Sequence, residues 1–106
     1  MDLLILFDEV QCGVGRTGKI FAYQWFDIKP DVMALAKGLG GGFPIGACLM
    51  RDDIAEALIP GTHGSTFGGN PLAMAVGNCF MDIVNKVDFL SNVEKNGLFF
   101  KNQLDK

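Results

Sequence analysis

Residues 3–9 of the chain read LLILFDE, an unbroken apolar run that ends in two acids. Runs of this kind are typical of strands buried on both faces, as in parallel sheets. Two further short apolar runs follow, DVMALA at residues 31–36 and IGACLM at residues 45–50. The three runs predict three strands in an α/β protein.

The connections between these runs predict the topology of the sheet. Residues 9–31 separate the first two runs and are long enough for a crossover between parallel strands, with a short helix at 21–26. Only residues 38–44 separate the second run from the third, too few for a crossover, so this pair is expected to be antiparallel. The sheet is therefore predicted to be mixed, mostly parallel and flanked by helices.

Helix signals dominate the second half of the chain. Residues 60–69 are a loop rich in Gly, Ser and Thr, and Asn70-Pro71 is a helix start with Asn as N-cap and Pro in the first turn. Gly97 interrupts the last helical pattern and costs about 1 kcal/mol relative to Ala. The helices expected from these patterns cover residues 52–58, 72–87 and 88–106.

Composition excludes several classes of protein. The chain has 106 residues, 49% of them hydrophobic and 20% charged, which indicates one soluble, folded domain. Its net charge of −3 argues against a nucleic-acid partner. No apolar run approaches the ~20 residues that span a membrane. The start MDLLILFDE has no basic segment, so it reads as a strand and not as a signal peptide.

The sulfur and imidazole side chains give no metal-site pattern. Three widely spaced cysteines form neither a disulfide framework nor a zinc motif and fit a reducing, cytoplasmic location. The lone histidine, His63, lies in a loop, where a structural role is commoner than a ligand role. Side chains expected to pack in the interior are Cys12, Cys48, Cys79, Met33, Met50, Met74 and Met81.

Asp8 and Lys37 each follow a predicted strand. If these strands are parallel, both side chains emerge at the sheet edge where α/β proteins bind ligands. The pair could be a simple ion pair. It could also hold pyridoxal 5'-phosphate (PLP), whose aldehyde needs a lysine and whose ring nitrogen needs a carboxylate.

Two glycine-rich segments weigh on this choice. Lys37 is followed by GLGGGFP, which lets backbone approach a ligand closely. Ser65 and Thr66 lie between glycines just before the helix start at Asn70, an arrangement that can bind phosphate. The alternative for these hydroxyls is a plain helix cap.

The string GVGRTG at residues 13–18 resembles two unrelated phosphate-binding loops. A dinucleotide-binding loop would follow its strand directly and open a long helix, which this string does not do. A protein-kinase loop would need a V-A-I-K lysine and an H-R-D loop, and neither occurs in the chain. Both interpretations are set aside.

Three long motifs in order carry a family resemblance. They are LLILFDEVQCGVGRTGKIFAYQ at 3–24, KPDVMALAKGLGGGFPIGACL at 29–49 and HGSTFGGNPLA at 63–73. Together they resemble class-III, fold-type I PLP aminotransferases, and the wording is closer to acetylornithine enzymes than to ornithine or 4-aminobutyrate enzymes. The resemblance implies that residues 1–106 are part of the PLP-binding large domain, without its N-terminal part and without the C-terminal small domain.

The resemblance also implies roles for single residues. Lys37 is expected to form the Schiff base with PLP and to move the substrate proton, and Asp8 to pair with the ring nitrogen. Val10 is expected to pack on one ring face and Gln11 to bond near the ring 3-hydroxyl. Glu9 belongs to the same cofactor-contacting segment without a separate task.

The remaining roles involve substrate and a second subunit. Thr66 is expected to bind the cofactor phosphate across a homodimer interface, and Ser65 to lie beside the acylated substrate. Arg16 has no assigned role beyond a structural salt bridge. The implied reaction moves the δ-amino group of N2-acetylornithine to 2-oxoglutarate in arginine biosynthesis.

Two alternatives stay open. One is a sister activity on ornithine or 4-aminobutyrate. The other is a non-catalytic remnant that binds cofactor weakly or only pairs with another subunit, because no phosphate loop, ring-stacking aromatic residue or carboxylate-binding arginine of the family is matched here.

Overall fold

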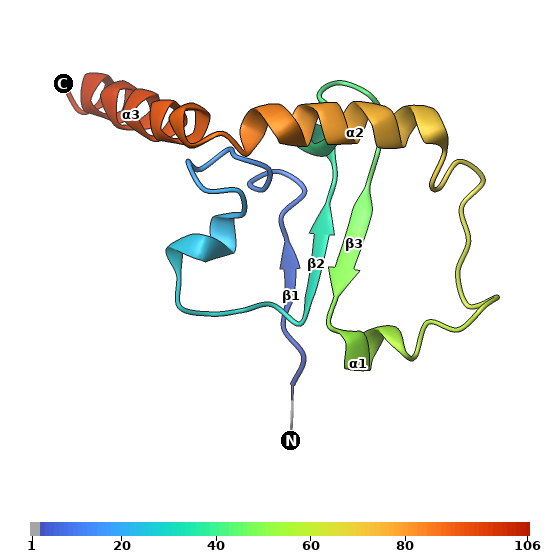
Figure 1. Ribbon diagram of the computed structural model, residues 1–106. Helices are drawn as coiled ribbons and strands as arrows, with labels where there is room; N and C mark the ends of the chain where they lie inside the picture. Colours follow the sequence, from blue (N-terminus) through green and yellow to red (C-terminus); the bar gives the residue numbers. More distant parts are fainter. Residues whose placement is uncertain (1–2) are drawn as a thin grey trace.

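The computed structural model describes residues 3–106, within which three short strands form one sheet in the order β1-β2-β3. The strands are β1 (Leu6–Asp8), β2 (Val32–Leu35) and β3 (Ala47–Met50). β1 and β2 are parallel, whereas β2 and β3 are antiparallel (Figure 1). The mixed sheet predicted from the connection lengths is confirmed.

Helices connect and follow the strands. The 3-10 helices are η1 (Ala22–Trp25) and η2 (Lys37–Gly40), and the α-helices are α1 (Asp52–Ala55), α2 (Pro71–Val84) and α3 (Val87–Leu104). Helix α2 begins as predicted, because the side chain of Asn70 accepts a hydrogen bond of 2.9 Å from the Ala73 N–H. Figure 1 shows α2 lying across the end of the sheet where β1 and β2 stop.

The interior of the described chain is small. Its radius of gyration is 16.1 Å, against about 13 Å for a compact domain of 100 residues. Accordingly, many large apolar side chains remain exposed. The buried apolar side chains are Val14, Met33, Leu35, Ala73 and Val84. Three of these form one cluster, namely Val14, Met33 and Leu35.

Several burial predictions are wrong. The first strand begins at Leu6, not Leu3, and Leu6 is 63% exposed, so β1 is not buried on both faces. The reason is that α2 crosses one end of the sheet and does not cover both faces (Figure 1). The predicted interior side chains found exposed are Cys48, Cys79 and Met74.

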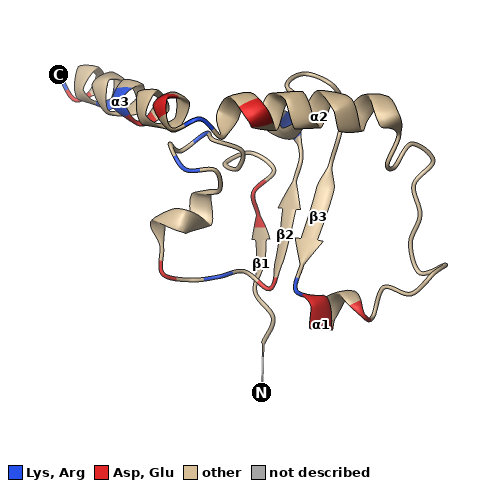
Figure 2. Ribbon diagram, viewed as in Figure 1, with Lys and Arg blue, Asp and Glu red and all other residues tan. Residues whose placement is uncertain are grey.

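An ion cluster holds the end of the sheet away from α2, where Figure 2 shows acids and a base side by side. Arg51, just after β3, pairs with Asp31, just before β2, and binds Asp53 with two hydrogen bonds of 2.9 and 2.6 Å. Asp31 also accepts a 2.7 Å bond from the Ile5 N–H. This Arg51 cluster therefore ties all three strands together.

Candidate active site

Strand pairing brings Asp8 and Lys37 to one edge of the sheet. Asp8 is the last residue of β1 and lies opposite Ala34 of β2. Lys37 follows Ala34 by three positions and begins η2. Because β1 and β2 are parallel, both residues lie where the strands end, as predicted.

The acid and the amine at this edge are not paired with each other. One carboxylate oxygen of Asp8 accepts a 3.0 Å bond from the Val10 N–H. The Nζ of Lys37 donates a 2.6 Å bond to the amide oxygen of Gln11. Within residues 3–106, ion pairs are found only at Arg51, so the ion-pair alternative for Asp8 and Lys37 is not realised.

The backbone of Lys37 is strained. Its φ of 42° lies in the left-handed region, which costs a non-glycine residue about 1–2 kcal/mol. Strain of this kind clusters at functional sites, where the surrounding structure holds it. Here β2 ends at Leu35, and the Leu39 N–H donates a 3.0 Å bond to the Ala36 carbonyl, so the lysine lies on a closed turn.

Glu9 has a different environment from its neighbours. It is 3% exposed, whereas Asp8 and Gln11 are exposed. Its carboxylate oxygens accept 2.7 Å bonds from the backbone N–H groups of Ala22 and Tyr23, at the start of η1. Glu9 therefore contributes to this edge by holding the turn after β1, a task that the sequence did not reveal.

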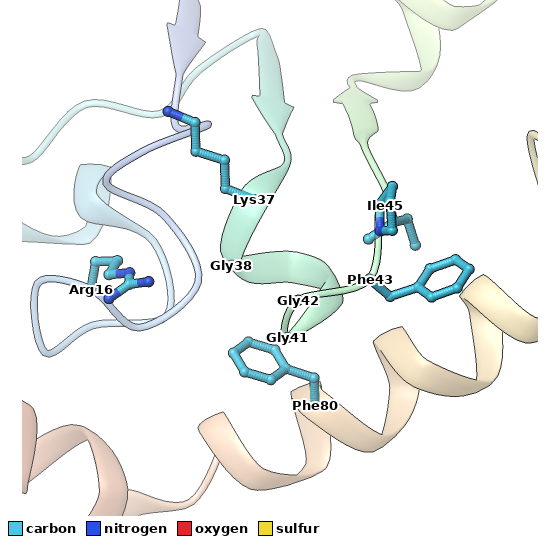
Figure 3. A pocket seen from close by; sticks show the side chains of 9 residues that line it. Arg16, Lys37, Gly38, Gly41, Gly42, Phe43, Ile45 and Phe80 are labelled. Atoms are coloured by element: carbon cyan, nitrogen blue, oxygen red, sulfur yellow. The ribbon is translucent and has the colours of Figure 1, made fainter.

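A hollow of about 730 Å³ lies next to the edge, and Lys37 is one of the residues that line it. Arg16, Phe43 and Phe80 line it together with glycines 38, 41 and 42. In Figure 3 the Lys37 side chain points away from Arg16 and Phe80, toward the end of β1. The chemistry of the edge, rather than the size of the hollow, locates the candidate site.

The structure does not bring Ser65 and Thr66 to this edge. Both are exposed in a loop that lies on the far side of β3 from β1 (Figure 1). Ser65 adjoins Ile45, Gly46 and Asn70 at a smaller hollow. His63 is exposed in the same loop. A phosphate role for Thr66 thus stays a prediction that requires a second subunit.

Arg16 forms no ion pair with the residues that the structure describes, so the salt bridge considered for it is not present there. Over residues 3–106, no three potential metal ligands gather, and no helix has the length and apolarity needed to cross a membrane.

A family model described as Aminotransferase class-III matches residues 1–106. The chain belongs to this family. The class-III family uses PLP, and the structure allows a test of whether the residues at the edge suit that group. Among residues 3–106, an exposed primary amine without an anionic partner and an exposed carboxylate without a cationic one lie at neighbouring strand ends. This donor set fits the aldehyde and the ring nitrogen of PLP.

Known class-III aminotransferases are similar along almost the whole chain. The acetylornithine aminotransferase of Mesorhizobium japonicum is 57% identical over 96% of this chain, which spans 26% of that protein. The succinylornithine transaminase of Photorhabdus laumondii is 53% identical over 97% of the chain, again 26% of the relative. The chain therefore spans about a quarter of the curated relatives it matches.

A solved structure agrees in fold as well as in sequence. The ornithine delta-aminotransferase of Plasmodium falciparum superposes with a TM-score of 0.89 at 44% identity. The match covers 96% of this chain and 26% of the other. The mixed sheet and its helices are thus a portion of a fold-type I aminotransferase.

Proposed function

We propose that this chain is the PLP-binding part of a cytoplasmic aminotransferase that moves the δ-amino group of N2-acetylornithine to 2-oxoglutarate. The observation that carries the proposal is the meeting of Asp8 and Lys37 at one sheet edge, with no ion pair to either of them among residues 3–106. The sequence identity of 57% to an acetylornithine aminotransferase supports this donor. Ornithine and succinylornithine remain sister donors, because relatives named for both are also similar.

The groups at the edge would divide the work. PLP, when bound, supplies an electron sink for the substrate carbanion. The Lys37 Nζ would hold the cofactor aldehyde covalently and then move a proton to and from the substrate α-carbon. The Asp8 carboxylate would keep a proton on the ring nitrogen through a charge-assisted hydrogen bond.

The other predicted residues would bind and orient the cofactor. Val10 would pack on a ring face, and Gln11, already bonded to Lys37 at 2.6 Å, would lie near the ring hydroxyl. Thr66 would bind the phosphate of a partner subunit's site in a homodimer, and Ser65 would border the acyl group of the substrate.

The visible absorbance of the purified chain mixed with PLP tests the proposal. A band of lysine-linked cofactor is expected in the parent and not in Lys37→Ala, whereas Lys29→Ala should keep it. Turnover of acetylornithine faster than of ornithine or 4-aminobutyrate supports the donor. A parent without a Lys37-dependent band would contradict cofactor binding.

A second candidate function has support from chain length. The chain spans 26% of the curated relatives, so cofactor binding without turnover is a distinct outcome. It predicts the same Lys37-dependent band, unchanged by any of the three amino donors.

A further inference from the structure

We infer that Glu9 is a positioning residue, which fixes the turn after β1 so that Gln11 meets the amine of Lys37. This inference rests on the proposed function of Lys37 and deepens it. Sequence places Glu9 between the predicted ring-nitrogen partner and the predicted ring-facing residue. Its side chain, however, is buried and faces the backbone of its own chain.

Glu9 is the point where three separate pieces of backbone are joined. Its N–H donates a 3.0 Å bond to the Ala34 carbonyl of β2. Its own carbonyl accepts a 2.9 Å bond from the Gly13 N–H, which closes the turn of residues 9–13. Its carboxylate accepts hydrogen bonds from the N–H groups of Ala22 and Tyr23, which hold the far end of the connection between β1 and η1.

Both carboxylate oxygens of Glu9 are occupied by hydrogen bonds from backbone N–H groups. A buried carboxylate is costly unless its oxygens accept hydrogen bonds, and bonds to a charged acceptor are the stronger kind. Both oxygens of Glu9 have a 2.7 Å partner. Gly13 is packed so tightly that an added Cβ would lie 2.7 Å from the Glu9 carbonyl oxygen. The turn therefore has little freedom to move while Glu9 keeps its partners.

Gln11 is the residue that connects Glu9 to the amine of Lys37. Gln11 lies in the turn of residues 9–13, which the bond from the Gly13 N–H to the Glu9 carbonyl closes. Its amide oxygen is 2.6 Å from the Lys37 Nζ. Apart from this bond, the lysine amine has no hydrogen-bond partner among residues 3–106. Loosening the turn should therefore release the amine, although neither Gln11 nor Lys37 is altered.

Two substitutions disrupt the hydrogen bonds of the Glu9 carboxylate, one at the acceptor and one at a donor. Glu9→Gln keeps the length of the side chain but replaces one acceptor oxygen with a donor that faces an N–H group. Ala22→Pro removes the donor at the first position of η1, where proline is compatible with the backbone, and its ring carbon takes the place of the N–H hydrogen and displaces the Glu9 carboxylate. Phe21 before it is already extended, with φ −124° and ψ 143°, as a residue before proline requires. Asp31→Asn, at the other end of the sheet, is the matched control.

The first readout needs no cofactor. NMR of the chain alone reports the side-chain amide of Gln11, which should shift toward that of free glutamine in Glu9→Gln and in Ala22→Pro. Asp31→Asn should leave it in place. An unchanged Gln11 signal in both variants, with faster amide exchange in Glu9→Gln confined to residues 22 and 23, would overturn the inference and leave Glu9 a local cap.

The second readout uses PLP and borohydride, which fixes the cofactor to the lysine that holds it. Loss of one charge-assisted hydrogen bond corresponds to roughly tenfold in an equilibrium. The share of label on Lys37 relative to other lysines should fall by about that factor in Glu9→Gln, and the pH profile of labelling should change. An equal share and profile in parent and variant would contradict the inference. A parent without Lys37 label would defeat the proposed function instead, and the Gln11 signal would still decide the role of Glu9.

Discussion

Acidic and basic side chains lie at both ends of the sheet, but among residues 3–106 they form ion pairs at only one end. At the end beneath α2, Asp8 and Lys37 lie at adjacent strand ends, and among residues 3–106 their side chains bond only to a backbone N–H and to the Gln11 amide. At the other end, Arg51 pairs with Asp31 and Asp53. One end leaves its acid and amine free of ion pairs, whereas the other satisfies its charges within the chain.

This difference separates scaffold from chemistry. A guanidinium that binds a carboxylate with two hydrogen bonds fixes the relative position of the two side chains, and those donors are not available to a ligand. An amine bonded to a neutral amide has no carboxylate partner to be displaced, and the amine of a lysine can react with an aldehyde. Removal of charge should therefore reduce binding at one end and stability at the other.

The largest effect is expected for Asp8→Ala on cofactor affinity. Loss of a hydrogen bond to a charged partner is worth about 1.5–3 kcal/mol, or roughly 10- to 100-fold in affinity. Titration of the visible absorbance with PLP measures it. Asp53→Ala removes the same charge at the opposite end and should change affinity by no more than about twofold. Equal losses in the two variants would erase the distinction between the ends.

Stability should show the reverse order. Asp31 is 13% exposed and accepts bonds from Arg51 and from the Ile5 N–H. Asp31→Ala should lower the free energy of unfolding by about 1 kcal/mol because it removes the bonds from Arg51 and from the Ile5 N–H. Urea unfolding measures the change. Asp8→Ala should stay within about 0.5 kcal/mol of the parent, and a larger cost there than at Asp31 would count against the account.

An effect of similar size tests the strain at Lys37. With φ at 42°, the position favours glycine, so Lys37→Gly should exceed Lys37→Ala in unfolding free energy by about 1 kcal/mol. The same pair of substitutions at Lys101, inside α3, should give the opposite order, because helix interiors disfavour glycine. Equal stability of the two Lys37 variants would mean that the residue carries no backbone strain.

The smallest effect is a pH dependence at the Arg51 cluster. The hydrogen bond from Arg51 lowers the pKa of Asp53 below its ordinary value of 3.8. Its contribution to stability is therefore present above pH 3.8 and is lost as the pH falls through the lowered pKa of the folded chain. The Tm of the parent should exceed that of Asp53→Asn at neutral pH, and the two should converge in acid. A gap that stays constant into strong acid would have another cause.

Sequence reasoning recovered the features that connection length and strand ends determine. The parallel and antiparallel pairs followed from residues 9–31 and 38–44, and the positions of Asp8 and Lys37 at one edge followed from those pairs. The start of α2 was readable because Asn70-Pro71 is a local signal that needs no distant partner.

What sequence missed depends on contacts between distant backbone groups. Two adjacent acids give no sign that Glu9 is buried and Asp8 exposed, because the N–H donors to Glu9 lie 13 and 14 residues away and have no side-chain signature. Burial of both faces of β1 was wrong for a related reason. Apolar residues show that a face can be covered, but not that this chain supplies the cover.

The protonation state of the cofactor ring tests the central claim most directly. The chain is loaded with PLP labelled with 15N in its ring, and the 15N chemical shift is compared between the parent and Asp8→Asn. A protonated ring nitrogen in the parent and an unprotonated one in the variant is the predicted result. The same shift in both proteins would contradict the claim that Asp8 and Lys37 hold opposite ends of one cofactor.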